Sequence, residues 1–162
     1  LSPVEEGDYK QIGAACLGYG HVVGASSPID VNLAKQLNIL ITDMRLDLDR
    51  VLMDPTTGAL GYGLEYTYSV MERLRLAALT GDAVLQLPMI VTAGYEAWRA
   101  TETRVNEGVP AEWGDWERRS LSWEMMTATA LLEAGADIVV LRHPESVAVT
   151  QDVITKLMNG AA

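Results

Sequence analysis

The stretch that decides the fold is Met53-Asp54-Pro55-Thr56-Thr57-Gly58-Ala59-Leu60-Gly61-Tyr62-Gly63-Leu64-Glu65-Tyr66. It continues the short apolar run 51–53, and it leads into an amphipathic helix pattern over 66–80. This succession predicts a strand, a polar glycine-rich loop and a helix. In proteins built from βα units, the loops that follow the strands form the ligand-binding face. The loop is therefore the first candidate for a binding site, although its polar side chains also suit an ordinary turn.

Strand and helix patterns alternate along the whole chain. Short apolar runs predict strands at 22–26, 51–53, 87–91 and 137–141. Helix patterns occupy 8–19, 27–44, 66–80, 116–134 and 144–160. Strands separated by helical crossovers are expected to run parallel in chain order, with the helices on the outer side. The strand runs lack polar alternation, which is typical of strands buried on both faces.

The length of the chain limits the architecture to part of a barrel. An eight-stranded (β/α)8 barrel needs ~250 residues, whereas this chain has 162. We therefore predict one partial barrel domain over 1–162, a leading helix plus four βα units, and interpret it as the second half of a TIM-type (β/α)8 barrel. A Rossmann fold is disfavoured because the glycines of the loop do not follow the G-x-G-x-x-G spacing.

Local signals predict where the helices begin and end. Ser27 is expected to cap the second helix, with Pro28 in its first turn and Asp30 completing a box-like pair. Asp115 is expected to cap the helix 116–134. Glycines are expected to terminate four helices, at Gly20, Gly81, Gly135 and Gly160.

Composition excludes several classes of function. The net charge of −10 argues against a nucleic-acid partner, because no basic stripe offsets it. No apolar run approaches the ~20 residues of a membrane span. The single Cys16 and two histidines rule out an iron–sulfur cluster or zinc cage built by this chain alone. The lone cysteine fits the reducing cytoplasm, and the start without methionine suggests a piece of a longer protein.

Four long runs carry a resemblance to a known family, and they cover 28–40, 53–63, 66–80 and 139–145. These runs resemble the small subunit of the corrinoid iron–sulfur protein, whose archaeal counterpart is the delta subunit of the acetyl-CoA decarbonylase/synthase complex. The similarity extends over nearly the whole chain and matches the C-terminal half of that subunit. One position departs from the resemblance: Arg45 stands where a glycine is expected, so a left-handed helix stop there would cost ~1 kcal/mol.

The resemblance implies a TIM barrel akin to pterin-binding methyltransferases. It implies a heterodimer with a large subunit, which holds an iron–sulfur cluster and most of a cobalamin-type corrinoid. This chain would cap that corrinoid without being catalytic and without an iron–sulfur cluster of its own. The cobalt would carry a methyl group from a methyl-tetrahydropterin to acetyl-CoA synthase in the Wood–Ljungdahl pathway, so a methyltransferase and acetyl-CoA synthase are implied as further partners. Pterin type and stoichiometry do not follow from the sequence.

Barrel position selects the candidate corrinoid-binding residues, which follow the predicted strands and are Ser26, Ser27, Asp54, Thr56, Thr57, Gly58, Gly61, Thr92, Gly94 and His143. Hydroxyls, carboxylates and backbone N–H groups suit the amide side chains of a corrin. We expect the loop from Asp54 to Gly63 to face the corrinoid, with its glycines allowing close approach. Gly61→Val or Thr57→Ala should then weaken partner association or cobalt methylation. No catalytic residue and no metal ligand is assigned.

Three alternatives stay open at this stage. The chain could be a pterin-dependent methyltransferase that binds the methyl-pterin itself; Asp54 is available for this, but no asparagine follows another strand. It could be an interaction module, as Trp98, Trp113 and Trp116 indicate. His143 could serve as a lower cobalt ligand or acid–base group, or it could cap a helix locally.

Overall fold

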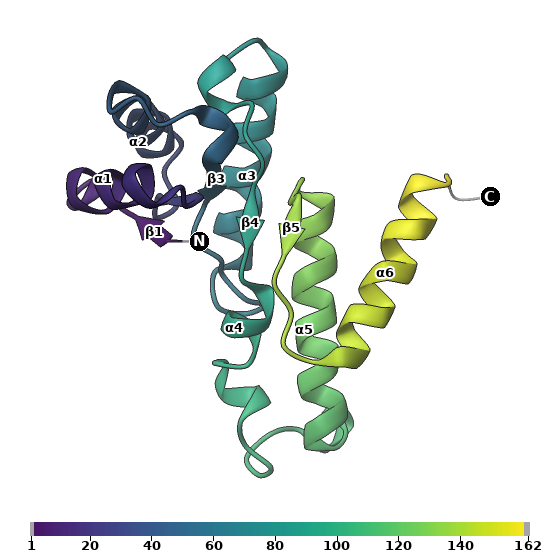
Figure 1. The fold of residues 1–162 in the computed structure, drawn as a ribbon. Coiled ribbons are helices and arrows are strands. Elements are labelled where there is room, and N and C mark those ends of the chain that lie inside the picture. The colour runs from purple at the N-terminus through teal and green to yellow at the C-terminus, as the bar shows by residue number, and fades with distance from the viewer. Residues whose placement is uncertain (1, 161–162) are drawn as a thin grey trace.

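The structure is a computed structural model that describes residues 2–160, and it is an α/β fold (Figure 1). Its strands are β1 Ser2–Val4, β2 Val23–Ser26, β3 Val51–Asp54, β4 Ile90–Val91 and β5 Ile138–Val139. Its α-helices are α1 Tyr9–Tyr19, α2 Val31–Asp43, α3 Leu64–Leu79, α4 Ala93–Ala97, α5 Trp116–Glu133 and α6 Pro144–Met158. Short 3-10 turns lie at Leu48–Arg50, Ala83–Leu85, Thr101–Thr103 and Ala111–Trp113.

The described strands are parallel and follow the order of the chain. β1 pairs with β2 and β2 with β3, while β4 pairs with β5. A single parallel bridge between Met53 and Met89 joins the two groups, and the Met53 N–H donates to the carbonyl of Pro88 at 2.8 Å. The predicted parallel arrangement is confirmed. Within residues 2–160 the strands form an open array rather than a closed barrel, so a half-barrel remains a proposal.

Some details of the predicted elements were wrong. The first strand, β1, was not predicted, because three residues are too few to show a pattern. The cap of α2 is Asp30 rather than Ser27, since its carboxylate accepts the N–H groups of Asn32 at 2.7 Å and Leu33 at 3.1 Å. The short helix α4 lies between the predicted strand 87–91 and the predicted helix 116–134, where no helix was predicted. The regular pairing of β4 and β5 covers only two residues of each strand, fewer than the predicted five.

Other terminal signals act as predicted. Gly20 ends α1 in the left-handed conformation, and Asp115 caps α5 by accepting the Arg118 N–H at 3.0 Å. Pro144 lies in the first turn of α6. Arg45 has φ +64°, so a non-glycine residue does occupy the left-handed stop after α2.

One core joins the strands to the helices that pack on them. Its fully buried members come from β1, β2 and β3, from one face of α2 and α3, and from α5, and they include Val4, Val23, Leu37, Met53, Met71, Leu74, Met89 and Leu131. In Figure 1, α1 and α2 lie at one end of the molecule and α6 at the other, with β4 and α3 between them. The core is therefore continuous from β1 to α5, while α6 packs mainly against α5.

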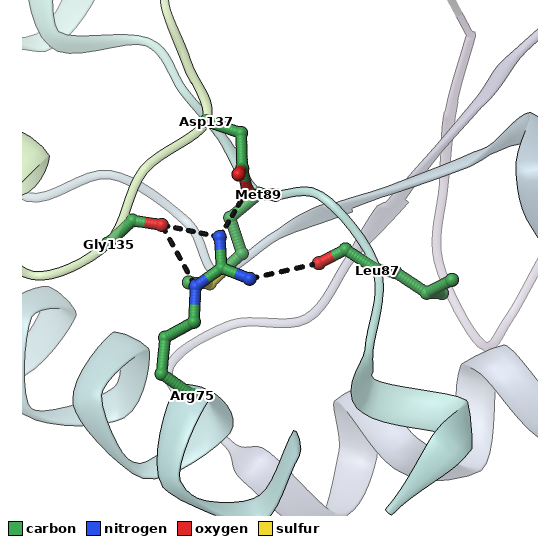
Figure 2. A network of polar contacts seen from close by, with 5 residues as sticks. All are labelled: Arg75, Leu87, Met89, Gly135 and Asp137. Carbon is green, nitrogen blue, oxygen red and sulfur yellow. Dashed lines mark hydrogen bonds and ion pairs between the residues drawn. The ribbon is translucent and has the colours of Figure 1, made fainter. Parts of the chain in front are cut away.

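A side chain from α3 ties together the segments that enter β4 and β5. The guanidinium of Arg75 donates to the carbonyl of Gly135 from Nε at 3.0 Å and from Nη2 at 2.5 Å, and it reaches the Leu87 carbonyl at 3.5 Å. It also pairs with Asp137, whose carboxylate accepts the Met89 N–H at 2.7 Å. Figure 2 shows these groups converging on the guanidinium. We call this the Arg75 network; it holds the amino ends of β4 and β5 in register.

Candidate functional site

Polar residues gather where β2, β3 and β4 end. The register pairs Ser26 with Asp54 on neighbouring strands. The Ser27 N–H donates to the Asp54 carbonyl at 2.9 Å. The Thr92 N–H donates to the hydroxyl oxygen of Thr57 at 2.8 Å, which joins the end of β4 to the loop after β3. Five predicted site residues therefore lie together at the carboxyl ends of the strands, as the barrel interpretation expected.

Asp54 is the most perturbed titratable group of this cluster. Burial raises the pKa of its carboxyl, and the nearby Glu96 carboxylate raises that pKa further, while the hydrogen bond from the Thr56 N–H opposes the shift. That hydrogen bond to Oδ1 is 2.9 Å long. Glu96 itself pairs with Arg99 at 3.0 Å. A partly desolvated carboxyl with this raised pKa can donate as well as accept a hydrogen bond when it is protonated.

The loop after β3 is held in a strained conformation by α3. Thr56 has φ +65°, which is rare for a β-branched residue. The hydroxyl of Thr67 donates to the Thr56 carbonyl at 2.9 Å and accepts the Gly58 N–H at 2.8 Å. Strain of this kind persists only where surrounding contacts enforce it, and it clusters at binding sites.

Not every predicted site residue presents its side chain to solvent. Ser27 is 1% exposed and Thr57 is 7% exposed, and the Thr57 hydroxyl is already used by Thr92. Ser26, Asp54, Thr56 and Thr92 are partly exposed. These four are therefore the members of the cluster whose side chains can meet a ligand.

The structure explains within the chain itself why glycine suits positions 58, 61 and 94. A Cβ on Gly58 would come within 2.4 Å of the backbone of Gly63. A Cβ on Gly94 would come within 2.5 Å of the Arg142 nitrogen and 2.6 Å of the Glu124 carboxylate. Gly61 has φ +73°, so Gly61→Val would strain the backbone. Gly61 also lines a pocket against α3, away from the strand-end cluster.

A buried carboxylate that the sequence did not single out organises the ends of β4 and β5. Glu124 on α5 is fully buried. Its Oε1 accepts the N–H of Arg142 at 2.5 Å, and its Oε2 accepts the indole N–H of Trp98 and the hydroxyl of Ser146, both at 2.9 Å. The Arg142 guanidinium lies 4.7 Å from the Trp98 ring centre. In the sequence, Glu124 looked like one of the exposed acids of a helix, so no local pattern marked it as buried.

His143 is used locally. Its Nδ1 accepts the N–H of Glu145 at 3.2 Å and so caps α6. In the neutral ring the proton then resides on Nε2, which leaves no lone pair there for a metal. His143 also stacks on Trp98, with ring centres 6.3 Å apart. This geometry favours the local cap over the cobalt ligand among the alternatives considered for this residue.

Within residues 2–160, no three histidine, cysteine, aspartate or glutamate side chains gather closely enough to hold a metal ion. None of the helices in this part of the chain combines the length and the apolar character needed to cross a bilayer. The strand-end cluster presents hydroxyl and carboxyl groups that can form hydrogen bonds.

Comparison with solved structures shows the class of fold to which the chain belongs. The chain is similar to Yersinia pestis DHPS solved with a pterine-sulfa conjugate, at TM-score 0.61 and 14% identity, over 91% of this chain and 56% of that one. It is also similar to a dihydropteroate synthase from Clostridium difficile, at TM-score 0.56 and 14% identity, over 90% and 54% of the two chains. At this identity the likeness shows the fold alone: a parallel α/β protein.

Comparison of sequences shows the family of the chain. Residues 1–156 match the family model described as CO dehydrogenase/acetyl-CoA synthase delta subunit, and the chain belongs to this family. It is 43% identical over 155 residues to the acetyl-CoA decarbonylase/synthase complex subunit delta of Methanosarcina mazei, covering 93% of this chain and 35% of that protein. The Methanopyrus kandleri subunit delta is 42% identical over 156 residues, with coverages of 96% and 38%.

The comparisons confirm the predicted family and correct the share of the subunit that the chain was expected to cover. We expected a match to half of the subunit, but the chain spans just over a third of the length of the curated relatives it matches. The activity, partners and cofactors of the whole subunit therefore belong to the proposal that follows.

Proposed function

We propose that this chain is the part of the delta, or small, subunit that caps a corrinoid held mainly by a partner large subunit. The observation that carries the proposal is the cluster at the carboxyl ends of β2, β3 and β4, where Ser26, Asp54, Thr56 and Thr92 are partly exposed. When bound, the corrinoid supplies a cobalt that accepts and donates a methyl group. The methyl group would come from a methyl-tetrahydropterin and go to acetyl-CoA synthase in the Wood–Ljungdahl pathway.

The chemistry of the cluster fits the edge of a corrin. Corrin amide side chains need both donors and acceptors, and the three hydroxyls supply both. Asp54 can accept from an amide when ionised and can donate when protonated, which its raised pKa favours. The residues of this chain would therefore orient the ring edge and exclude water from it, while the large subunit holds most of the cofactor. The interior lone Cys16 suits the reducing cytoplasm in which such a complex would work.

The test compares aspartates that flank the same strand. Asp54 ends β3, whereas Asp47 lies before it, is exposed and makes no side-chain capping bond. In the full-length subunit, Asp54→Asn and Ser26→Ala should each weaken association with the corrinoid-bearing partner or slow cobalt methylation about fivefold, the worth of one hydrogen bond. Asp47→Asn should change neither quantity. Equal behaviour of Asp54→Asn, Ser26→Ala and Asp47→Asn in both assays contradicts the proposal.

A second candidate function is binding of the methyl-pterin by the subunit itself, as in a pterin-dependent methyltransferase. The observation that favours it is the partly buried Asp54 carboxyl at a strand end, because a carboxyl can recognise the nitrogen edge of a pterin. Titrating methyl-tetrahydropterin against the full-length subunit without its partner distinguishes the two functions. Corrinoid capping predicts no saturable pterin binding, whereas the enzyme function predicts binding that Asp54→Asn abolishes.

A further inference from the structure

All four tryptophans of the chain line two adjoining pockets along α5. The first pocket, of about 740 Å³, contains Trp98 and Trp116, and the second, of about 600 Å³, contains Trp113 and Trp123. Arg118 and Ser122 line both pockets, so the two adjoin one another. We call this surface the tryptophan groove. It runs along α5 and includes one residue that the helix buries, Arg119.

Three of the four rings are held by hydrogen bonds before any partner binds. The indole N–H groups of Trp116 and Trp123 donate to the carbonyls of Thr103 at 2.7 Å and Leu60 at 2.9 Å. Trp98 is fixed by Glu124. Trp113 is 45% exposed, and its indole N–H donates to none of the residues the structure describes. A rigid aromatic surface with one free donor loses little entropy on binding.

The charges around the groove are mostly negative and are not neutralised locally. Asp115, Glu117 and Glu145 line the first pocket and Glu112 lines the second. None of these four forms an ion pair with a cation among residues 2–160.

Part of this acidity has a local role in the helices. Asp115 caps α5, and Glu117 and Glu145 lie in first turns, where acids also stabilise a helix. Glu112 lies in the first turn of a 3-10 helix of only three residues, where the helix dipole that an acid could stabilise is small.

The two arginines of the groove offset this charge only in part. Arg118 is exposed. Arg119 is buried, and its guanidinium donates to the carbonyls of Glu102 at 2.7 Å, Gly114 at 2.9 Å and Val105 at 2.5 Å. Arg119 therefore serves to hold the loop that carries Trp113 and does not face a ligand. The exposed lining has four acids against one arginine, and Arg142, which lies over the Trp98 ring, adds a second exposed positive charge beside the groove.

We propose that the tryptophan groove binds a basic segment of a partner protein, one that carries arginine or lysine beside apolar side chains. Indole faces attract cationic side chains, and free carboxylates pair with guanidinium groups. Tryptophan is also enriched among the residues that dominate the energy of protein interfaces. The acidity disfavours phosphates and other anions. This inference does not depend on corrinoid capping, because the groove and the strand-end cluster use different residues.

The probe is a short fluorescein-labelled peptide of alternating arginine and leucine, titrated by anisotropy against the full-length chain. Glu112→Gln combined with Glu117→Gln removes two groove charges. The matched control combines Asp43→Asn with Glu133→Gln, which removes two charges from exposed positions elsewhere on α2 and α5. The groove variant should weaken binding about fivefold or more, as two exposed ion pairs allow, while the control stays within twofold. Trp113→Ala should weaken binding as well, with an unchanged circular dichroism spectrum.

Several results would overturn the proposal. Undetectable binding of the basic peptide would do so, as would equal weakening by the groove and control variants, which would assign binding to net charge alone. Equal affinity for a peptide of alternating glutamate and leucine would exclude a cation-selective groove. Loss of corrinoid-subunit association without loss of peptide binding in the groove variant would assign this surface to the corrinoid instead. Asp54→Asn should leave peptide binding unchanged, which separates this inference from the proposed function.

Discussion

The two ends of the parallel strands use charged helix residues in different ways. At the amino ends of β4 and β5, Arg75 donates to two carbonyls and pairs with Asp137, and Asp137 in turn accepts a backbone N–H. At the carboxyl ends, Glu124 is equally well satisfied by N–H and O–H donors. In the strand-end cluster, by contrast, Asp54 is partly desolvated near the Glu96 carboxylate, and Thr56 is strained.

This difference is the basis of the proposed division between a stabilising end and a binding end of the strands. The amino-end network is closed: its charged groups use one another and the backbone, so it serves stability. At the carboxyl ends, the Glu124 carboxylate is fully hydrogen-bonded within the chain. The strand-end cluster, however, includes a partly desolvated carboxyl at Asp54 and a strained backbone at Thr56. Local costs of this kind are retained where a ligand compensates for them. The following variants test this division, beginning with the largest expected effect.

Glu124→Ala should have the largest effect on folding. It removes the acceptor of the Arg142 N–H, the Trp98 indole and the Ser146 hydroxyl, and it leaves a cavity in a fully buried site. We expect the free energy of unfolding to fall by about 3 kcal/mol or more. Urea denaturation measures this loss, with the exposed Glu133→Ala on the same helix as the control. A loss below about 1 kcal/mol, the worth of a single hydrogen bond, would mean that the Glu124 network does not organise the ends of β4 and β5.

Arg75→Met should destabilise the protein less and leave binding intact. The guanidinium is partly exposed, so the cost of losing its hydrogen bonds is about 1–2 kcal/mol. Arg73→Met, at an exposed position on the same helix, controls for the loss of a positive charge. Denaturation should separate the two variants, and association with the corrinoid-bearing partner should be the same in both. Weaker association in Arg75→Met alone would break the assignment of the amino ends to stability.

Thr56→Gly should change stability and function in opposite directions. Glycine adopts φ +65° without strain, so the folded state should gain up to about 1 kcal/mol, less the greater freedom of glycine in the unfolded chain. Loss of the hydroxyl should weaken association with the corrinoid-bearing partner. Thermal denaturation and partner titration measure the two effects on one sample. A less stable variant with unchanged association would identify Thr56 as an ordinary turn residue.

Asp54→Asn should have the smallest effect on stability, and that effect should depend on pH. Because the folded pKa of Asp54 is raised, ionisation disfavours the folded state. The cost begins as pH rises past the ordinary aspartate pKa, about 3.9, and is complete above the raised folded pKa. The uncharged amide of the variant avoids this cost, so the variant should be the more stable protein at neutral pH and should lose that advantage in acid. Parallel stability curves for the two proteins from acid to neutral pH would contradict the assigned shift.

Sequence reasoning succeeded where a signal is local. Gly20, Asp115 and Pro144 each act through their own neighbours in the chain, so their roles could be predicted from the residues around them. The choice of Ser27 over Asp30 as a cap failed because both residues suit the position, and only the observed backbone decides between them. The strand β1 was missed because it is defined by its pairing with β2 rather than by a pattern of its own.

The site was only partly predictable for a related reason. Barrel position predicted that Asp54, Thr56 and Thr92 lie at the carboxyl ends of the strands, because the carboxyl ends of parallel strands meet at one face. The roles of Glu124 and Arg75 depend on partners 18 and 60 residues away along the chain, which no local pattern encodes. The crowding of the glycines could not be predicted, since Gly58 lies against Gly63 where the loop folds back on itself and Gly94 lies against Arg142 and Glu124 from other segments.

Hydrogen exchange of the full-length subunit, with and without its corrinoid-bearing partner, tests the central claim most directly. We predict new protection at the carboxyl ends of the strands, in residues 53–60 and 92–98. We predict no change at the amino ends that the Arg75 network joins, in residues 86–89 and 133–138. Protection confined to those amino-end segments, or absent from both sets, would contradict the assignment of the carboxyl-end cluster to the corrinoid.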